Sequence, residues 1–225
     1  MVAELIDDDP ELAHQHAISA SRRAGRIPVA REALAATAYR IGDYALALRE
    51  LRTHRRLSGD QGNIALMVEA ERALARPQKG IETGLEADTS LLTPAQRAQL
   101  AIALSGARLD LGQTQQALFE LEIPELDPTR AFSYSPELFA AYGAVLEELG
   151  RDAEAQQWFE RAERAESALN SRLAESDQLE VLEIIEYAED QTRDAHDQLE
   201  AADEREADSP VIPPSVDEPP ADPEA

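Results

Sequence analysis

The chain of 225 residues contains no cysteine, few aromatic side chains and no long apolar run. The absence of cysteine excludes disulfides, zinc-thiolate sites, iron-sulfur clusters and thiol catalysis together. Aromatic residues make up 4% of the chain and there are only 7 valines, a composition that disfavours β-sheet. No stretch approaches the roughly 18 apolar residues of a membrane span. Residues 1–9 lack the segments of a signal peptide, so we expect a cytoplasmic protein without a membrane partner.

Charge is distributed unevenly along the chain, whose net charge is −24. Residues 174–225 hold 18 acids and two arginines, whereas residues 22–79 hold 12 basic and 6 acidic residues. The chain is therefore weakly basic near its beginning and strongly acidic near its end. The basic residues are 20 arginines and a single lysine, Lys79. This preference for arginine over lysine, together with abundant alanine, favours a bacterial high-GC genome.

Local signals place the starts of several helices. Asp9 is followed by a proline, which predicts a first helix over about residues 10–24. Thr93 and Gln96 enclose another proline in the pattern of a capping box. Ser135, again followed by a proline, is expected to cap a later helix.

Between these signals, apolar and small residues recur at spacings of three and four, which indicates amphipathic helices of roughly a dozen residues. Short turns separate the helices, and their anchors lie 33, 37 and 38 residues apart: Gly42, Ala75, Gly112 and Gly150. A period in the mid-thirties is typical of stacked helical hairpins. An irregular helical bundle or another solenoid is the alternative, although four turns at similar spacing are hard to obtain by accident.

The segment from Pro136 to Ala165 resembles a tetratricopeptide repeat (TPR) nearly throughout. Gly150 stands at the turn of the repeat, Gly143 and Ala155 stand where its two helices cross, and Phe159 fills the space between layers. Tyr142 and Ala162 also match the repeat pattern. Two other segments are similar through Gly42, Ala47, Gly112 and Ala117. Residues 61–87 depart most, because Ala75 replaces the turn glycine and because Gly80 and Gly84 replace larger residues. We expect the second helix of that unit to be loose and short.

The resemblance implies an all-α fold, an α-solenoid of about four TPR-like hairpins after an N-terminal helix, over residues 10–168. Residues 1–9 precede it as an N-terminal extension. Residues 169–208 are expected to form an acidic capping and extension helix, whose apolar side chains near Val181 cover the last repeat. Residues 209–225 contain six prolines and no aromatic residue, which predicts a disordered acidic tail.

Residues with the chemistry for catalysis or metal binding are sparse. His14 and His16 are two positions apart and point to different sides of a helix, while His54 and His196 stand among polar residues. We expect all four to be solvated or half-buried. The acidic runs lack the ligand pattern of a calcium loop, and no phosphate-binding glycine loop or nucleophile elbow occurs. We therefore expect no enzyme activity, no cofactor and no metal.

In the TPR family, the first helices of the hairpins line a concave groove that binds a peptide or protein partner. The resemblance therefore implies a non-catalytic interaction adaptor or scaffold. By alignment with the family, the groove-facing positions are Glu32, Ala36, Tyr39, Arg40, Glu69, Arg72, Gln99, Ile102, Leu109, Ala140 and Glu147. One subgroup grips a terminal carboxylate with Lys, Asn and Arg side chains, and the residues here do not match that clamp.

A stripe of arginines gives a second candidate surface. Arg49, Arg52 and Arg56 are three and four residues apart on one helix, with Arg55 beside them. They form either a basic patch for an acidic partner or a solvated face offset by Glu50. The first interpretation makes the protein an RNA- or ribosome-associated module with the acidic tail as a competitor, although no aromatic residues interleave the stripe. Salt dependence separates the two functions, because nucleic-acid binding weakens steeply as salt rises.

Two truncations test the predicted organisation of the C-terminal quarter. Deleting residues 209–225 is expected to leave the melting temperature almost unchanged, because this segment lacks an apolar helical face. Deleting everything after Leu173 is expected to promote association, since it uncovers the apolar face of the last repeat. Thermal unfolding and light scattering measure the two effects. Equal stability and solubility of both proteins would contradict the capping role.

Overall fold

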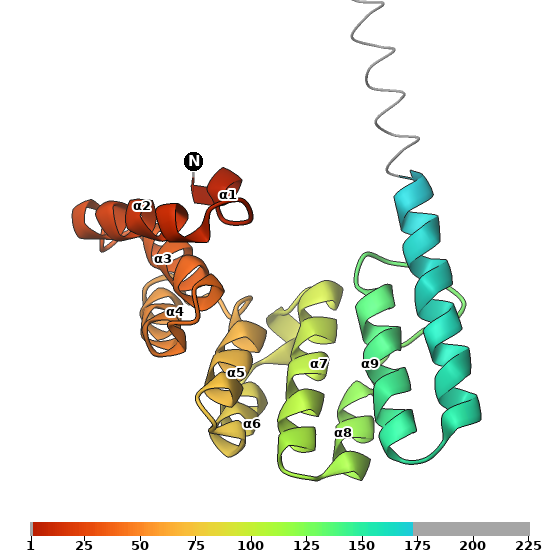
Figure 1. Ribbon diagram of the computed structural model, residues 1–225. Coiled ribbons are helices and arrows are strands. Elements are labelled where there is room, and N and C mark those ends of the chain that lie inside the picture. Colours follow the sequence, from red (N-terminus) through yellow and green to blue (C-terminus); the bar gives the residue numbers. More distant parts are fainter. Residues whose placement is uncertain (1, 173–225) are drawn as a thin grey trace, which may run out of the picture. The chain divides into compact units, whose positions relative to one another are not determined.

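The computed structural model describes residues 2–172, and all regular secondary structure in that range is helical. The predicted all-α fold is confirmed. Figure 1 shows the helices in chain order. They are α1 (Val2–Leu5), α2 (Pro10–Arg23), α3 (Pro28–Arg40), α4 (Tyr44–Ser58), α5 (Ile64–Ala73), α6 (Pro77–Leu85), the 3₁₀ turn η1 (Thr89–Leu91), α7 (Pro94–Asp110), α8 (Thr114–Leu121), α9 (Ser135–Glu148) and a last helix whose described part covers residues 152–172.

Consecutive helices pair as hairpins, and each hairpin packs on the next. The pairs are α3 with α4, α5 with α6, and α7 with α8. The second helix of each pair also contacts the first helix of the following pair, while α5, α7 and α9 lie side by side. The helix α2 packs on α3 ahead of the first pair. This arrangement is a TPR-like solenoid, so the repeat fold expected from the turn spacing is confirmed.

The apolar core lies mainly between hairpins. One cluster joins α4, α5, α6 and α7 through side chains such as Leu51, Val68 and Ile81. A second cluster joins α7, α8, α9 and the last helix around Leu121 and Leu138. Each of these side chains is at most 2% exposed, and full burial of a leucine contributes roughly 1.5 to 3 kcal/mol. The helix α7 contributes to both clusters and is therefore the element that joins the two halves of the core.

The starts of the helices follow the predicted capping chemistry with one exception. The Asp9 carboxylate accepts a hydrogen bond of 3.0 Å from the Leu12 N–H, and the capping box between Thr93 and Gln96 is present. The prediction for Ser135 was wrong, because Ser135 is the first residue of α9 and not its cap. Its hydroxyl accepts a 3.0 Å hydrogen bond from the Phe132 N–H and so gives this backbone donor of the preceding loop a partner.

The four turn anchors all adopt the left-handed backbone conformation. The φ angles are 84° at Gly42, 57° at Ala75, 70° at Gly112 and 71° at Gly150. A Cβ atom at the three glycines would meet nothing within 4 Å, so the turns require glycine for backbone conformation rather than for space. Ala75 adopts the same conformation with a Cβ atom, which costs roughly 1 to 2 kcal/mol.

The second helix of the unit that departs most from the repeat pattern is short but not loose. The helix α6 has nine residues, and α8 is shorter still with eight. A Cβ atom at Gly84 would lie 2.7 Å from Leu104 Cδ2, and one at Gly80 would lie 3.2 Å from the Val68 carbonyl oxygen. The two glycines therefore let α6 approach α5 and α7 closely, which overturns the expectation of loose packing.

Two histidines are buried, contrary to the expectation that all would be solvated or half-buried. His14 is 8% exposed and His54 is 5% exposed. His14 Nδ1 lies 3.0 Å from the Thr37 hydroxyl oxygen, and that hydroxyl donates to the Ala33 carbonyl at 3.0 Å. A hydroxyl has one proton, so the tautomer of His14 with a proton on Nδ1 is the one that donates to Thr37 while Thr37 donates to a carbonyl. His196 lies outside the described residues.

The C-terminal expectations fall mostly outside the described range. The last helix runs from residue 152 through residue 172, so no helix end marks the boundary expected at 168. The rest of the expected capping helix and the acidic tail at 209–225 lie outside the described residues. Over residues 2–172, no helix is both long and apolar enough to cross a bilayer.

The left-handed anchors predict opposite effects of exchanging glycine and alanine at two turns. Gly112→Ala is expected to destabilise the protein by about 1 kcal/mol, because a Cβ atom is strained at this φ although space is free. Ala75→Gly relieves that strain but adds about 0.4 to 1 kcal/mol of unfolded-chain entropy. It is therefore expected to leave stability unchanged or slightly raised. Urea unfolding measures both, and a comparable loss at the two sites would contradict the backbone explanation.

Candidate functional site

The predicted groove positions lie on the first helices of the hairpins. Glu32, Ala36, Tyr39 and Arg40 are in α3, Glu69 and Arg72 in α5, Gln99, Ile102 and Leu109 in α7, and Ala140 and Glu147 in α9. Because α5, α7 and α9 lie side by side (Figure 1), their exposed faces contribute to one surface. We call the surface formed by these helix faces, with that of α3, the groove.

A concavity of about 370 Å³ brings three of these positions together. They are Glu69, Gln99 and Ile102, from two adjacent helices. Five further residues complete the lining: Gly62, Asn63, Ala65, Leu66 and Glu137. Its volume lies within the usual range for ligand pockets, about 300 to 1,000 Å³. It combines apolar side chains with two side-chain amides and two carboxylates.

The additional lining residues differ in how well the sequence could have indicated them. Leu66 precedes Glu69 by three positions and so shares its helix face. Asn63 is the residue directly before α5. Predicting the start of α5 to within one residue from the sequence would have placed Asn63 at the end of the groove-lining helix. Glu137 is in the first turn of α9, and its approach to α7 depends on how the hairpins stack. No spacing in the sequence reports that approach.

Arg72 is held by two carboxylates and joins α5 to α7. Its Nε donates to Asp110 Oδ2 at 2.8 Å, and its Nη2 donates to Asp110 Oδ1 at 3.2 Å. Its Nη1 donates to both Glu69 oxygens, at 2.9 and 3.0 Å. The hydrogen bond to Asp110 is the main cause that raises the pKa of Arg72. These contacts occupy most of the guanidinium, so this predicted groove residue acts chiefly as a structural clamp.

Tyr39 of α3 lies close enough to Glu69 and Arg72 to interact with their charges. Its ring packs edge-on against Tyr44, with centroids 5.2 Å apart and planes at 71°. Burial raises the pKa of Tyr39, and the negative charge of Glu69 raises it further. Tyr39 is therefore a neutral, partly buried residue at the edge of the groove.

The remaining predicted positions are not gathered at the concavity. Glu32 accepts a 2.7 Å hydrogen bond from Asn63 Nδ2 and so lies next to it. Arg40 forms an exposed ion pair of 2.8 Å with Asp7 of the N-terminal extension. Leu109 and Ala140 pack against core clusters, Ala36 is half-buried and Glu147 is exposed. The structure thus brings together the central groove positions and leaves those at its two ends apart.

The groove is acidic over the described residues. Five carboxylates line or border it: Glu32, Glu69, Asp110, Glu137 and Glu147. Two arginines, Arg40 and Arg72, oppose them, and both are engaged by carboxylates. The charge that remains on this surface is therefore negative.

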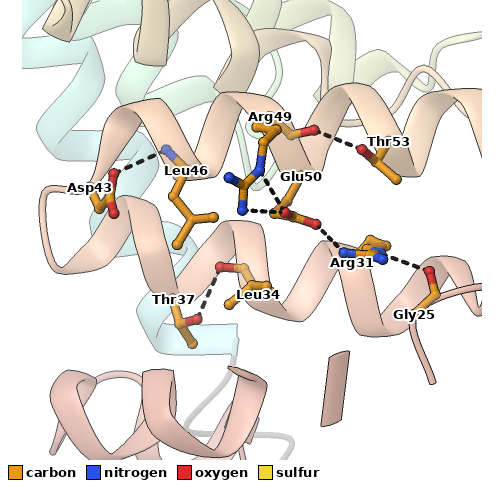
Figure 2. Close-up of polar contacts among 9 residues, drawn as sticks. All are labelled: Gly25, Arg31, Leu34, Thr37, Asp43, Leu46, Arg49, Glu50 and Thr53. Atoms are coloured by element: carbon orange, nitrogen blue, oxygen red, sulfur yellow. Dashed lines mark hydrogen bonds and ion pairs between the residues drawn. The ribbon is translucent and has the colours of Figure 1, made fainter. Parts of the chain in front are cut away.

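The arginine stripe stands over buried carboxylates. Glu50 is 3% exposed, and Figure 2 shows it between Arg31 of α3 and Arg49 of α4. Arg31 Nη1 donates to Glu50 Oε2 at 2.7 Å, and Arg49 Nε donates to Glu50 Oε1 at 3.0 Å. Glu50 therefore offsets part of the positive charge of the stripe, as the interpretation of a solvated face supposed. It does so as a buried residue between α3 and α4 and not as a surface residue.

The rest of the stripe divides between paired and unpaired arginines. Arg52 Nη2 donates to Glu71 Oε1 at 2.7 Å, and Glu71 is 1% exposed. Arg55 has only a long contact of 3.5 Å to Gln61. Arg56 has no hydrogen bond or ion pair with any residue of the described range. Arg49 and Arg52 therefore bind buried carboxylates of the fold, whereas Arg55 and Arg56 have donors available for other contacts.

Within residues 2–172, no three histidine, aspartate or glutamate side chains gather so that they could hold a metal ion. Of the groove carboxylates, Glu69 and Asp110 bind Arg72, and Glu32 accepts a hydrogen bond from Asn63. The chemistry that the described surfaces offer is hydrogen bonding, apolar contact and charge.

Two solved structures of MamA, a TPR-like helical-repeat protein, resemble this fold. One superimposes with a TM-score of 0.55 at 17% identity, covering 75% of this chain and 95% of that one. A MamA double mutant superimposes with a TM-score of 0.55 at 15% identity, covering 76% and 93%. No protein-family model and no curated protein sequence matches the chain. At this identity the likeness shows the TPR-like fold.

The clamp between α5 and α7 predicts energetic coupling between Arg72 and Asp110. A double-mutant cycle with Arg72→Ala and Asp110→Ala is expected to give about 1 kcal/mol, because the pair is bidentate and partly buried. The exposed pair of Arg151 and Glu154 provides the control and is expected to couple less. Urea unfolding of the single and double variants measures both cycles. Equal coupling in the two pairs would show that Arg72 does not clamp the helices.

Proposed function

We propose that the protein is an interaction adaptor that binds a peptide or protein partner in the groove. The concavity between α5, α7 and α9 is the observation that supports this function. It is formed by side chains from three successive repeats, so a ligand that fills it contacts several hairpins at once. The TPR-like fold is compatible with that role but does not specify it.

The lining of the concavity suits a polypeptide ligand. Leu66 and Ile102 offer apolar contact for one large side chain. The amides of Asn63 and Gln99 can each donate and accept, which matches the alternating donors and acceptors of a peptide backbone. Glu69 and Glu137 add negative charge at the same place. We infer that the preferred partner segment carries an apolar anchor and at least one Lys or Arg.

The RNA- or ribosome-associated alternative has less support from the contacts. Arg49 and Arg52 hold buried carboxylates, so part of the stripe serves the fold. The nearby rings of Tyr39 and Tyr44 pack against each other rather than presenting faces to bases. The net charge of −24 also opposes a polyanion at a distance. The groove therefore takes precedence as the functional surface.

A charge-reversing pair of substitutions tests the groove. Peptides selected from a random display library on the wild-type chain are expected to be enriched in Lys or Arg beside an apolar residue. Gln99→Lys with Glu137→Lys is expected to weaken their binding by about tenfold or more, roughly 1.4 kcal/mol. Gln99 and Glu137 are exposed and have no hydrogen bond within residues 2–172, so the fold should be unaffected. Titration calorimetry gives the affinities.

Gln78→Lys with Glu82→Lys is the matched control. Gln78 and Glu82 are both exposed on α6, outside the concavity. Their substitution changes the net charge by the same amount as the substitution of Gln99 and Glu137. The control is expected to retain binding. Equal loss in the two double variants, or enrichment of acidic peptides, would contradict a groove that selects basic segments.

A further inference from the structure

A second concavity, of about 350 Å³, lies between α4 and the turn that joins α5 to α6. Four arginines contribute to its lining: Arg49, Arg52, Arg56 and Arg76. We call this concavity the arginine pocket. It shares no lining residue with the groove concavity, so it is a separate surface.

The fold brings these arginines together from two hairpins. Arg49, Arg52 and Arg56 follow one face of α4 because they are three and four residues apart. Arg76 comes from the next hairpin, directly after Ala75, the anchor that adopts a left-handed conformation without being glycine. The second hairpin packs on α4 and so sets Arg76 beside the same pocket. The sequence showed the stripe, but it did not show that a fourth arginine completes it.

The carboxylates that accompany these arginines are buried, whereas the guanidinium groups are exposed. Glu50 and Glu71 have side chains that are 3% and 1% exposed. The side chains of Arg49, Arg52 and Arg76 are 70%, 55% and 53% exposed. A ligand that approaches from solvent therefore meets guanidinium donors and not carboxylate oxygens.

Several donors remain available. Arg56 makes no hydrogen bond or ion pair within residues 2–172, and Arg76 has only a 3.9 Å ion pair with Glu71. Arg52 uses one nitrogen, Nη2, for Glu71. Four positive charges face two buried negative charges, one of which also binds Arg31. The pocket thus keeps a net positive charge in a chain that is strongly acidic.

We propose that the arginine pocket binds the phosphate group of a phosphoserine or phosphothreonine on a protein partner. A phosphomonoester carries about −1.5 to −2 charges at neutral pH and three strong acceptor oxygens. Planar guanidinium groups match such oxygens with paired hydrogen bonds. Arginine clusters recognise phosphorylated segments for this reason. The inference deepens the proposed adaptor function, because it adds a condition, phosphorylation, to the binding of a protein.

The arrangement favours a single phosphomonoester over a nucleic acid. RNA offers one charge per phosphate, and its single strands are bound along grooves that interleave basic and aromatic residues. No aromatic residue lines the arginine pocket or the neighbouring concavity of about 510 Å³ that shares Arg52 and Arg56. A compact dianion instead concentrates its charge within the one concavity that the four arginines line.

Fluorescence anisotropy with defined probes tests the proposal. The probes are a labelled peptide with one phosphoserine between neutral residues, the same peptide with serine, and a single-stranded RNA oligonucleotide. The phosphopeptide is expected to bind more tightly than the serine peptide, by about tenfold or more. Its affinity is expected to exceed that of the RNA and to fall as salt rises.

Variants of Arg56 assign the binding to the pocket. Arg56→Gln is expected to weaken phosphopeptide binding by about tenfold without lowering the melting temperature, because Arg56 holds no buried carboxylate. Arg56→Lys keeps the charge but loses the fork, so a smaller loss is expected. Arg164→Gln removes an exposed, unpaired arginine outside the pocket in the described part of the chain and is expected to have no effect.

Equal affinity for the phosphoserine and serine peptides, or equal loss in the Arg56→Gln and Arg164→Gln variants, overturns the proposal. Tighter binding of RNA than of the phosphopeptide, lost on Arg56→Gln, also overturns it and assigns the surface to nucleic acid. The groove is judged separately: Gln99→Lys with Glu137→Lys leaves the pocket intact, so the two proposals can fail independently.

Discussion

The rest of the structure depends on one constraint, which is that the hairpins of residues 2–172 share most of their apolar core with their neighbours. The main core clusters lie between successive hairpins, and α7 takes part in both. Small residues make this packing possible. At Gly84 of α6, an added Cβ atom would lie 2.7 Å from Leu104 of the next hairpin, and at Gly143 of α9 one would lie 2.8 Å from Phe159 of the helix that follows α9. The repeats therefore stack in one register, and this register sets which side chains meet in the groove and in the arginine pocket.

Buried carboxylates that bind more exposed arginines recur at successive levels of the stack. Glu50 joins α3 to α4, Glu71 joins α5 to α4 and the following turn, and Glu125 accepts from Arg97 Nε at 2.7 Å. Glu71 and Glu125 each have one oxygen without a hydrogen-bond partner among the described residues. A buried charge is costly when its partner is removed, by about 3 to 5 kcal/mol. Arginines that resemble a binding patch in sequence therefore also hold the hairpins together.

This dual use explains how an acidic protein presents two surfaces of opposite sign. In the groove, carboxylates outnumber arginines and the arginines are engaged, so negative charge remains. In the arginine pocket, the carboxylates are buried and the guanidinium groups face solvent. The two surfaces differ in the sign of their charge because the carboxylate of each ion pair is buried at the arginine pocket, and not because of local composition alone. A partner with a basic segment and a phosphorylated residue would complement both.

The sequence by itself determined the helical class, the repeat period and the four turn anchors, because these follow from local backbone preferences and from apolar spacing within single helices. It also determined which residues share a helix face, as with Arg49, Arg52 and Arg56. Only the tertiary structure decided which faces meet. The burial of His14, Glu50 and Glu71, the close approach of α6, and the addition of Glu137 and Arg76 to their pockets all depend on contacts between segments distant in sequence. Local spacing does not encode such contacts, because they arise from the packing of one hairpin on the next.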